Sequence, residues 1–282
     1  MYNRIIAQRT EVASDMTSKW VFGVSVKKIS LIDTYLSMSE RFEVDMRQCC
    51  REFSSDEEFI EKIKPIRKNI YSYHLRYSSK KLGIGQELSF MDVTIRDVEM
   101  LANAGLIGEN GATSLVAHSE YPKSKEEFMR QLFKLRRTAE KYQVQLLIEN
   151  LPDRTNKTSD YYAPRSPKEI ADILEEINSG YLGLCLDTGH AICNSTSTES
   201  MDWDTPNTYK WVKHFHYHSS LPGQDLHLPI DNNTYPALIQ RFKKLCSGSQ
   251  NKGVAIFENV EPEDSQKSLI YTMDEEYKEI SS

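Results

Sequence analysis

Residues 182–190 read Leu-Gly-Leu-Cys-Leu-Asp-Thr-Gly-His, and this stretch decides the fold. Its first five residues carry no charge, which is typical of a β-strand buried on both faces of a parallel sheet. The run ends in Asp187, and His190 follows three residues later. Side chains directly after a parallel strand lie at the carboxyl edge of the sheet, where binding sites form. We therefore expect a buried strand here that delivers a carboxylate and an imidazole to a functional site.

Seven further short apolar runs accompany this stretch, and segments with helical periodicity separate them. The clearest helix pattern has Phe128, Leu132, Leu135 and Ala139 spaced four, three and four residues apart. Residues 124–127 read Ser-Lys-Glu-Glu, a capping box that predicts the start of this helix. The eight expected strands are Val21–Val26, Phe42–Met46, Ile70–His74, Ser114–His118, Val144–Glu149, Leu182–Asp187, Val212–His218 and Val254–Glu258.

Alternation of strands and helices along the whole chain predicts an α/β fold with parallel strands. Eight units of about 35 residues each favour a single (β/α)8 TIM barrel, with the site at the carboxyl ends of the strands. We assign residues 20–282 to this barrel and residues 1–19 to an N-terminal extension. Residues 78–112 are the least regular part and predict a loop followed by a helix near Val93–Ala104. The alternative is an open doubly wound sheet, but no glycine-rich phosphate turn follows the first run at Gly23.

Composition excludes several classes of protein. The chain has 35 Lys and Arg against 41 Asp and Glu, so its net charge of −6 excludes a strongly basic surface for nucleic acid, although a local basic patch stays open. Five cysteines without a CxxC pair argue against a zinc ribbon or a disulfide scaffold. No run approaches the roughly 18 apolar residues of a membrane span, and the first apolar run does not resemble a signal peptide. We expect a cytoplasmic protein without a membrane partner.

Imidazoles and carboxylates end most of the expected strands. Because the carboxyl ends of all barrel strands face the same side, these residues should converge although they are far apart in sequence. Together they are the ligand types of zinc, manganese or a similar divalent ion. The residues in question are His74, His118, Glu149, Asp187, His190, His216, Asp225, His227 and Glu258.

Four segments carry a resemblance to a known superfamily. They are Leu-Leu-Ile-Glu149-Asn150, Leu-Asp187-Thr-Gly-His190-Ala, Phe-His216-Tyr-His218 and Ile-Phe-Glu258-Asn. They resemble the xylose isomerase-like TIM barrels, which include sugar isomerases and epimerases and the endonuclease IV family of apurinic-site nucleases. The resemblance covers about residues 70–260, and the residue pattern is closest to the endonuclease IV family.

The two branches imply different numbers of ions. A sugar epimerase holds one Mn²⁺ or similar ion, here on Glu149, Asp187, His216 and Glu258. The endonuclease IV family holds up to three Zn²⁺, and the resemblance assigns the first to His74, His118 and Glu149. The second then lies on Glu149, Asp187, His216 and Glu258, and the third on His190, Asp225 and His227. The pair Asp225-x-His227 favours the three-ion branch, because a one-ion sugar enzyme does not need it.

The leading hypothesis is therefore a metal-dependent phosphodiester hydrolase that acts on DNA with an abasic lesion or on another phosphate ester. Glu149 would bridge two ions and Glu258 would orient the attacking water. The alternative is a sugar or sugar-phosphate isomerase or epimerase, in which Glu149 and Glu258 move a proton at a carbon beside the carbonyl. A third class is a metal-binding barrel without catalysis.

Several residues are candidates for substrate binding. Tyr77 lies three residues past the first ligand, and the resemblance implies that it enters DNA near the lesion; the alternative is a Tyr that covers the barrel rim. Arg76 lies in the same loop, residues 75–81, which also contains Lys80 and Lys81. Arg76 and Arg154, which follows the fifth strand, are candidates for phosphate contacts. We expect His218 to contact the substrate or to support a ligand.

Other features of the sequence carry less weight. His214 and Cys185 are expected to be structural. Asp45, Arg47 and Gln48 could line the pocket but carry no motif. Residues 230–233, Ile-Asp-Asn-Asn, stand where the related nucleases usually have a Gly-Glu-Gly turn, which argues against the nuclease branch.

Overall fold

The computed structural model describes residues 20–76, 90–109, 111–118, 124–152, 166–195, 205–230 and 253–280. Eight parallel strands close into a barrel in the order β1-β10-β7-β6-β5-β4-β3-β2, so the predicted α/β barrel is confirmed. Residues 1–19 lie outside the described residues. The barrel strands are β1 (Trp20–Val26), β2 (Phe42–Asp45), β3 (Ile70–His74), β4 (Ser114–His118), β5 (Gln145–Glu149), β6 (Leu182–Asp187), β7 (Val212–His216) and β10 (Gly253–Phe257).

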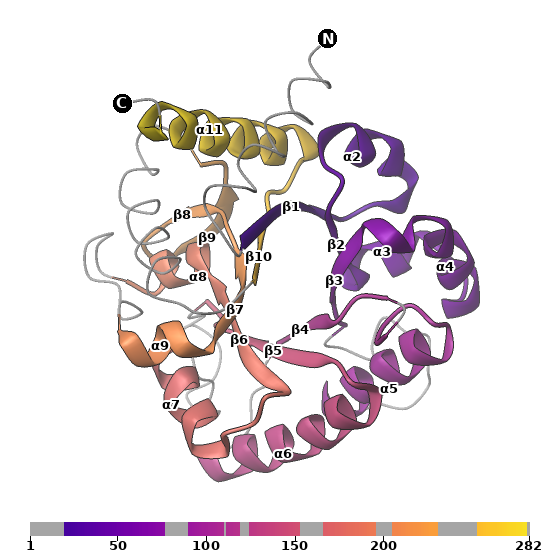
Figure 1. The fold of residues 1–282 in the computed structure, drawn as a ribbon, viewed down its shortest axis with the longest axis vertical. Coiled ribbons are helices and arrows are strands. Elements are labelled where there is room, and N and C mark those ends of the chain that lie inside the picture. The colour runs from indigo at the N-terminus through magenta and orange to yellow at the C-terminus, as the bar shows by residue number, and fades with distance from the viewer. Residues whose placement is uncertain are drawn as a thin grey trace.

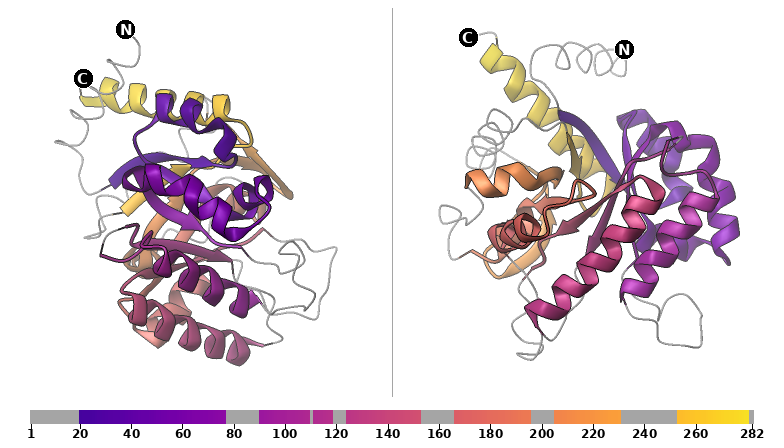
Figure 2. Two further views of the ribbon diagram at one scale, coloured as in Figure 1. Left: turned by 90° about the vertical axis from the view of Figure 1, so that its right-hand side faces the viewer. Right: turned by 60° about the horizontal axis from the view of Figure 1, so that its bottom comes forward.

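Helices surround the barrel on its outside (Figure 1), and the two further views show them packed along its wall (Figure 2). The helix predicted near Val93–Ala104 is α5, and Ser124 caps α6 by accepting a hydrogen bond from the Glu127 N–H. The α-helices are α2 (Ile32–Met38), α3 (Met46–Cys49), α4 (Asp56–Ile63), α5 (Phe90–Asn103), α6 (Lys125–Tyr142), α7 (Pro167–Ile177), α8 (Thr188–Cys193), α9 (Pro206–Trp211) and α11 (Pro262–Ile280). Short 3-10 helices span Ile29–Leu31, Cys50–Glu52 and Lys64–Asn69.

The seventh strand is shorter than predicted. It ends at His216, because the chain then turns to bind Thr188 at the start of α8. The Thr188 hydroxyl donates to the His218 carbonyl over 2.7 Å, and the His218 N–H lies 3.2 Å from the same hydroxyl. His218 is therefore placed by α8 and not by the strand pleat.

A small hairpin that the sequence did not predict follows this turn. Its strands are β8 (Ser219–Leu221) and β9 (Gln224–Leu228), joined through Gly223, which has a positive φ of 76°. The hairpin packs against α8, so it lies beside the carboxyl ends of β6 and β7. Asp225 and His227 reach the site from β9.

Strand alternation divides the barrel side chains into two sets. The outward set joins the surrounding helices in the main apolar core, which includes Leu146, Leu184 and Phe215. Residues two apart on a strand share a face, so Glu43 lies below Asp45 and His214 below His216. Both Glu43 and His214 are fully buried. The barrel interior is thus polar immediately beneath the strand ends.

No helix among the described residues combines the length and apolarity needed to cross a membrane.

Candidate metal centre

Glu149, at the end of β5, is the central residue of the site. Its carboxylate is 1% exposed, and its two oxygens face different partners. Oε2 lies 3.0 Å from His74 Nε2 and 2.9 Å from His118 Nε2, while Oε1 lies 3.1 Å from His216 Nδ1. One carboxylate therefore connects two groups of side chains, as the residue that bridges two ions would.

The larger of these groups contains Glu149, Asp187, His216 and Glu258. One ligand atom from each residue lies within 4.8 Å of the others, and all four residues are buried. His216 Nδ1 is 3.2 Å from Glu258 Oε2 and 3.7 Å from Asp187 Oδ2. Three carboxylates and one imidazole nitrogen form a donor set suited to a divalent ion such as Mn²⁺, Mg²⁺ or Zn²⁺.

The electrostatics of this group also fit a cation. Burial raises the pKa of Glu149, but His118 and His216 outweigh it and hold that pKa well below its usual range. Burial likewise raises the pKa of Glu258. Nearby cationic groups, first His216 and then Lys27, outweigh burial and hold that pKa well below its usual range. The pKa of His216 is high because the neighbouring acidic groups outweigh its burial. Buried carboxylates need compensating positive charge, which an ion would supply.

The second group is the triangle of His74, His118 and Glu149. The two imidazole Nε2 atoms lie 3.1 Å apart, and each lies about as far from Glu149 Oε2. Burial, followed by smaller opposing effects of Glu149, lowers the pKa of His118 to about 4. A neutral imidazole is the form that binds a metal.

A third group contains His190, His218 and His227. The rings of His218 and His227 stack with centroids 4.1 Å apart. Asp225 Oδ1 lies beside them, 3.6 Å from His190 Nε2 and 3.3 Å from His227 Nε2. The structure thus brings the predicted His190, Asp225 and His227 together, and it adds His218 to the possible ligands.

Backbone carbonyls orient four of the imidazoles. Each accepts at a ring Nδ1, and because a carbonyl can only accept, Nδ1 must carry the proton and Nε2 is left to bind. The four pairs are His74 with the Leu75 carbonyl at 3.2 Å, His190 with Asn150 at 2.9 Å, His218 with Ser219 at 3.1 Å and His227 with Glu258 at 2.8 Å. Fixed ring orientation of this kind is typical of metal-binding histidines.

Local backbone structure explains how the Asp-Thr-Gly-His segment presents its side chains. Asp187 caps α8, because its Oδ1 accepts from the His190 N–H over 2.6 Å. Asn150 holds the strand end from the other side: its Oδ1 accepts from the Asp187 N–H at 2.8 Å, and its amide donates to the Asp187 carbonyl at 2.9 Å. Both functional side chains are therefore fixed by the turn that carries them.

His227 has a left-handed backbone, with φ of 50°, which is uncommon for a residue other than glycine. The Asn259 amide donates to the His227 carbonyl over 3.1 Å and supports this conformation. Unfavourable backbone conformations persist where surrounding contacts enforce them, often at functional sites. Here the conformation lets the His227 ring stack on His218.

The predicted substrate contact by Arg76 is wrong. Its side chain is buried between α4 and α5, where Nε donates to Asp97 over 2.9 Å and Nη1 to Asp56 over 2.6 Å. Both carboxylates hold the guanidinium away from the site, so Arg76 has a structural role. Tyr77 and Arg154 lie outside the described residues.

Arg47 contributes a cation whose position the sequence did not specify. Asp45 binds its guanidinium through both oxygens, at 3.0 and 2.8 Å. Nη2 then lies 3.1 Å from Glu258 Oε1, and Nη1 lies 3.2 Å from His118 Nε2. A rigid cation beside two of the ligand groups could bind an oxygen of the substrate.

Glu43 is the site residue that sequence reasoning missed. It stands in the middle of β2, with its carboxylate fully buried against His214 and His216. The available signal was a charged residue between Phe42 and Val44 in an apolar strand, since such a charge needs a buried partner.

Comparison with solved structures gives the same fold over most of the chain. A D-tagatose 3-epimerase-like protein superposes with a TM-score of 0.67 at 17% identity, covering 93% of this chain and 99% of that one. The apo form of 3-keto-D-glucoside 4-epimerase from E. coli gives 0.59 at 12% identity, covering 90% and 98%. A xylose isomerase-like TIM barrel protein from Mycobacterium smegmatis in complex with magnesium gives 0.58 at 13% identity, covering 87% and 85%.

The sequence itself finds no match among curated proteins. A family model described as xylose isomerase-like TIM barrel, however, matches residues 77–268, which is more than half of the chain. The match includes every strand end from His118 to Glu258 described above. This chain therefore belongs to the xylose isomerase-like TIM barrel family.

Proposed function

We propose that this chain is a divalent-metal-dependent isomerase or epimerase of a sugar or a sugar derivative. The observation that carries the proposal is the convergence of Glu149, Asp187, His216 and Glu258 on one buried point. This set can hold one ion and also places two ionised glutamates beside it. From the sequence, this function is the alternative to a phosphodiester hydrolase, and it is the better supported of the two.

The two glutamates supply the acid–base chemistry. Glu149 ends β5 and Glu258 follows β10, and in the barrel these strands are separated by β6 and β7. The carboxylates therefore approach the His216 Nδ1 atom from two directions. One removes the proton from the carbon beside the substrate carbonyl. The other, once it has taken up a proton from solvent, returns a proton to that carbon or its neighbour. A divalent ion bound here would polarise the substrate oxygens. The proton on the carbon beside the carbonyl would then be more acidic and easier to remove.

Neighbouring donors can hold the substrate hydroxyls. His190 Nε2 and the Arg47 guanidinium lie at different edges of the four-residue group, near Asp225 and Glu258 respectively. The burial of His190 lowers its pKa, but Asp187 and Asp225 outweigh this and raise the pKa to about 10. In the absence of an ion His190 is therefore a cationic donor at neutral pH. Two donors beside different residues of the site can orient a polyhydroxylated substrate.

The structural relatives support the same class of reaction. One is named as 3-keto-D-glucoside 4-epimerase, and another is described as similar to a D-tagatose 3-epimerase. Each covers at least 90% of this chain.

Hydrogen exchange tests the proposal directly. The metal-loaded chain is incubated with a panel of ketoses, aldoses and their phosphates in D₂O, and NMR follows deuterium uptake at the carbon beside the carbonyl. We expect uptake with at least one sugar, and its loss in Glu258→Gln. Absence of exchange across the panel, in protein that holds its ion, would contradict the proposal.

A phosphoester hydrolase is the second candidate, and one specific observation favours it. The His74–His118–Glu149 and His190–His218–His227 groups could hold two further ions, which a one-ion sugar enzyme does not need. Metal content per chain, followed by assays on abasic DNA and bis(p-nitrophenyl) phosphate, separates the candidates. Three ions with phosphoester cleavage would favour the hydrolase, whereas one ion with sugar exchange would favour the isomerase.

A further inference from the structure

Glu43 lies one layer below the metal centre, inside the barrel. Its Oε1 is 2.9 Å from His216 Nε2, and its Oε2 is 3.0 Å from His214 Nε2. The Ser72 hydroxyl donates to Oε2 over 2.9 Å. All four side chains are 0% exposed, so Glu43 is a buried carboxylate whose partners come from β3 and β7.

His216 differs in ring orientation from four other imidazoles of the site. His74, His190, His218 and His227 each present Nδ1 to a backbone carbonyl and direct Nε2 towards the ligand groups. His216 is reversed: Nδ1 faces Glu149 and Glu258, and Nε2 faces Glu43. The group that faces its Nε2 is thus a charged side chain from β2, at 2.9 Å, and not a backbone carbonyl.

We infer that Glu43 is a positioning residue that fixes the proton of His216 on Nε2 and so presents Nδ1 as the metal-binding atom. A carboxylate behind a ligating imidazole sets its tautomer and makes the ligand more basic. Glu43 acts through His216 and does not touch the substrate. The inference rests on the proposed metal centre, which it deepens by one layer.

His214 and Ser72 hold Glu43 in place. Both contact Oε2, which leaves Oε1 directed at His216. His214 is two residues before His216 on β7, so the same strand supplies the ligand and the group that steadies its support. This arrangement explains why a histidine stands at position 214 without reaching the site above it.

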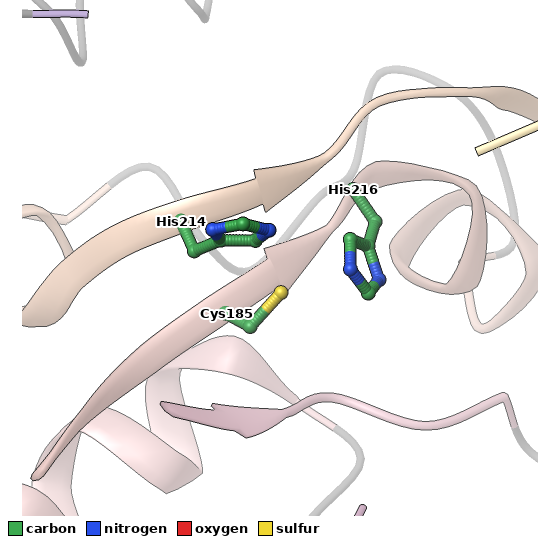
Figure 3. Close-up of side chains that lie close together, drawn as sticks. All are labelled: Cys185, His214 and His216. Carbon is green, nitrogen blue, oxygen red and sulfur yellow. The ribbon is translucent and has the colours of Figure 1, made fainter. Parts of the chain in front are cut away.

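A competing explanation is a second ion in this lower layer. Figure 3 shows the Cys185 thiol beside the rings of His214 and His216, and their ligand atoms lie within 4.8 Å of one another. Such an ion would have to bind Nε2 of His216 while the upper ion binds Nδ1. Glu43 already lies against the Nε2 atoms of both histidines, and we therefore favour a proton there.

The experiment measures the tautomer and the metal affinity in the full-length chain. Histidine is labelled with ¹⁵N, the protein is loaded with Zn²⁺, and long-range ¹H–¹⁵N NMR reports which ring nitrogen of His216 carries the proton. We expect a proton on Nε2 in the wild type. In Glu43→Gln we expect Zn²⁺ and Mn²⁺ affinity, measured by chelator competition, to fall about 10- to 100-fold. Ser72→Ala is the matched control, since it keeps the carboxylate and should lose far less affinity.

Three outcomes would overturn the inference and leave the proposed function standing. One is a wild-type His216 that carries its proton on Nδ1, a result that needs no variant to fold. Another is a Glu43→Gln protein with unchanged affinity. The third is a second tightly bound ion that Cys185→Ser removes. A wild type that binds no divalent ion overturns this inference together with the proposed function, whereas one that binds its ion but exchanges no sugar proton overturns only the proposed function.

Discussion

The His218 ring packs so closely on Gly189 that no residue with a Cβ atom fits at position 189. A Cβ atom at position 189 would lie 1.9 Å from Cε1 and 2.2 Å from Nδ1 of the His218 ring. The ring thus packs directly on the backbone of α8, where its Nε2 lies 3.0 Å from Asp187 Oδ1. The glycine in Asp-Thr-Gly-His is therefore explained by a residue 29 positions later in the chain.

Gly189→Ala should displace His218 and disturb the third ligand group. Overpacking in a dense interior destabilises by about 1–3 kcal/mol, and we expect a loss of that size in urea denaturation. If His218 is a metal ligand, the metal content of the variant should also fall. Gly180→Ala is the matched control, because nothing lies within 4 Å of a Cβ there. An alanine variant at 189 with wild-type stability and metal content would contradict this packing.

Glu149→Gln should remove more than one ion from a multi-ion protein. Its Oε1 and Oε2 face different ligand groups, and an amide offers one oxygen in place of two. We expect elemental analysis to show reduced metal content and turnover to be abolished. Glu61→Gln, at an exposed glutamate that pairs with Lys64, should change neither. Full metal content and full rate in Glu149→Gln would rule out its central role.

Arg76→Met should damage stability and leave catalysis unchanged. Removing one partner from a buried ion pair costs about 3–5 kcal/mol, and this substitution leaves Asp97, which is 0% exposed, without its cation. Arg96→Met is the comparison, since its pair with Asp56 is more exposed and should contribute less than about 1 kcal/mol. Urea denaturation and the turnover number distinguish the two effects. A lower turnover number at unchanged stability would restore Arg76 as a substrate contact.

The stability of the metal-free protein should depend on pH through His190. Burial lowers the pKa of His190, but Asp187 and Asp225 raise it to about 10, above the ordinary 6.5. A group with a raised pKa in the folded state stabilises fully below the unfolded value and loses this contribution as pH rises through the folded value. The free energy of unfolding of chelator-treated protein should therefore fall between about pH 6.5 and 10.

His190→Gln is the control for that experiment. The difference in unfolding free energy between wild type and variant should shrink as the pH rises, because only the wild type loses a proton from position 190. A difference that is constant across this range would show that His190 is not protonated in the folded metal-free protein.

The barrel was predictable because its signals are local. Each strand is a short, largely apolar run, six of the eight end in an imidazole or a carboxylate, and the closed fold follows from eight repeats of the strand–helix unit. The convergence of Glu149, Asp187, His216 and Glu258 followed from the same fact, since parallel strands end on one side. Knowledge of the strand ends was enough for the centre of the site.

The remaining parts of the site depend on contacts that periodicity does not encode. His218 was expected on the pleat of β7, but Thr188 draws the chain away from the strand. Arg76 was assigned to the rim because Asp56 and Asp97, which bury it, lie on helices before and after it in the chain. Glu43 stands in the middle of a strand, and only the closed barrel reveals His216 as its partner.

Because the two carboxylate oxygens of Glu149 face different ligand groups, few substitutions would be needed to change the number of bound ions in evolution. Its Oε2 serves His74 and His118, while Oε1 serves the four-residue group. Replacing the two histidines that end β3 and β4 would remove one ligand group and leave the other intact. Two substitutions at the ends of these strands could therefore convert a multi-ion ancestor into a descendant with one ion fewer, without any change of fold and without passing through a form that binds no metal.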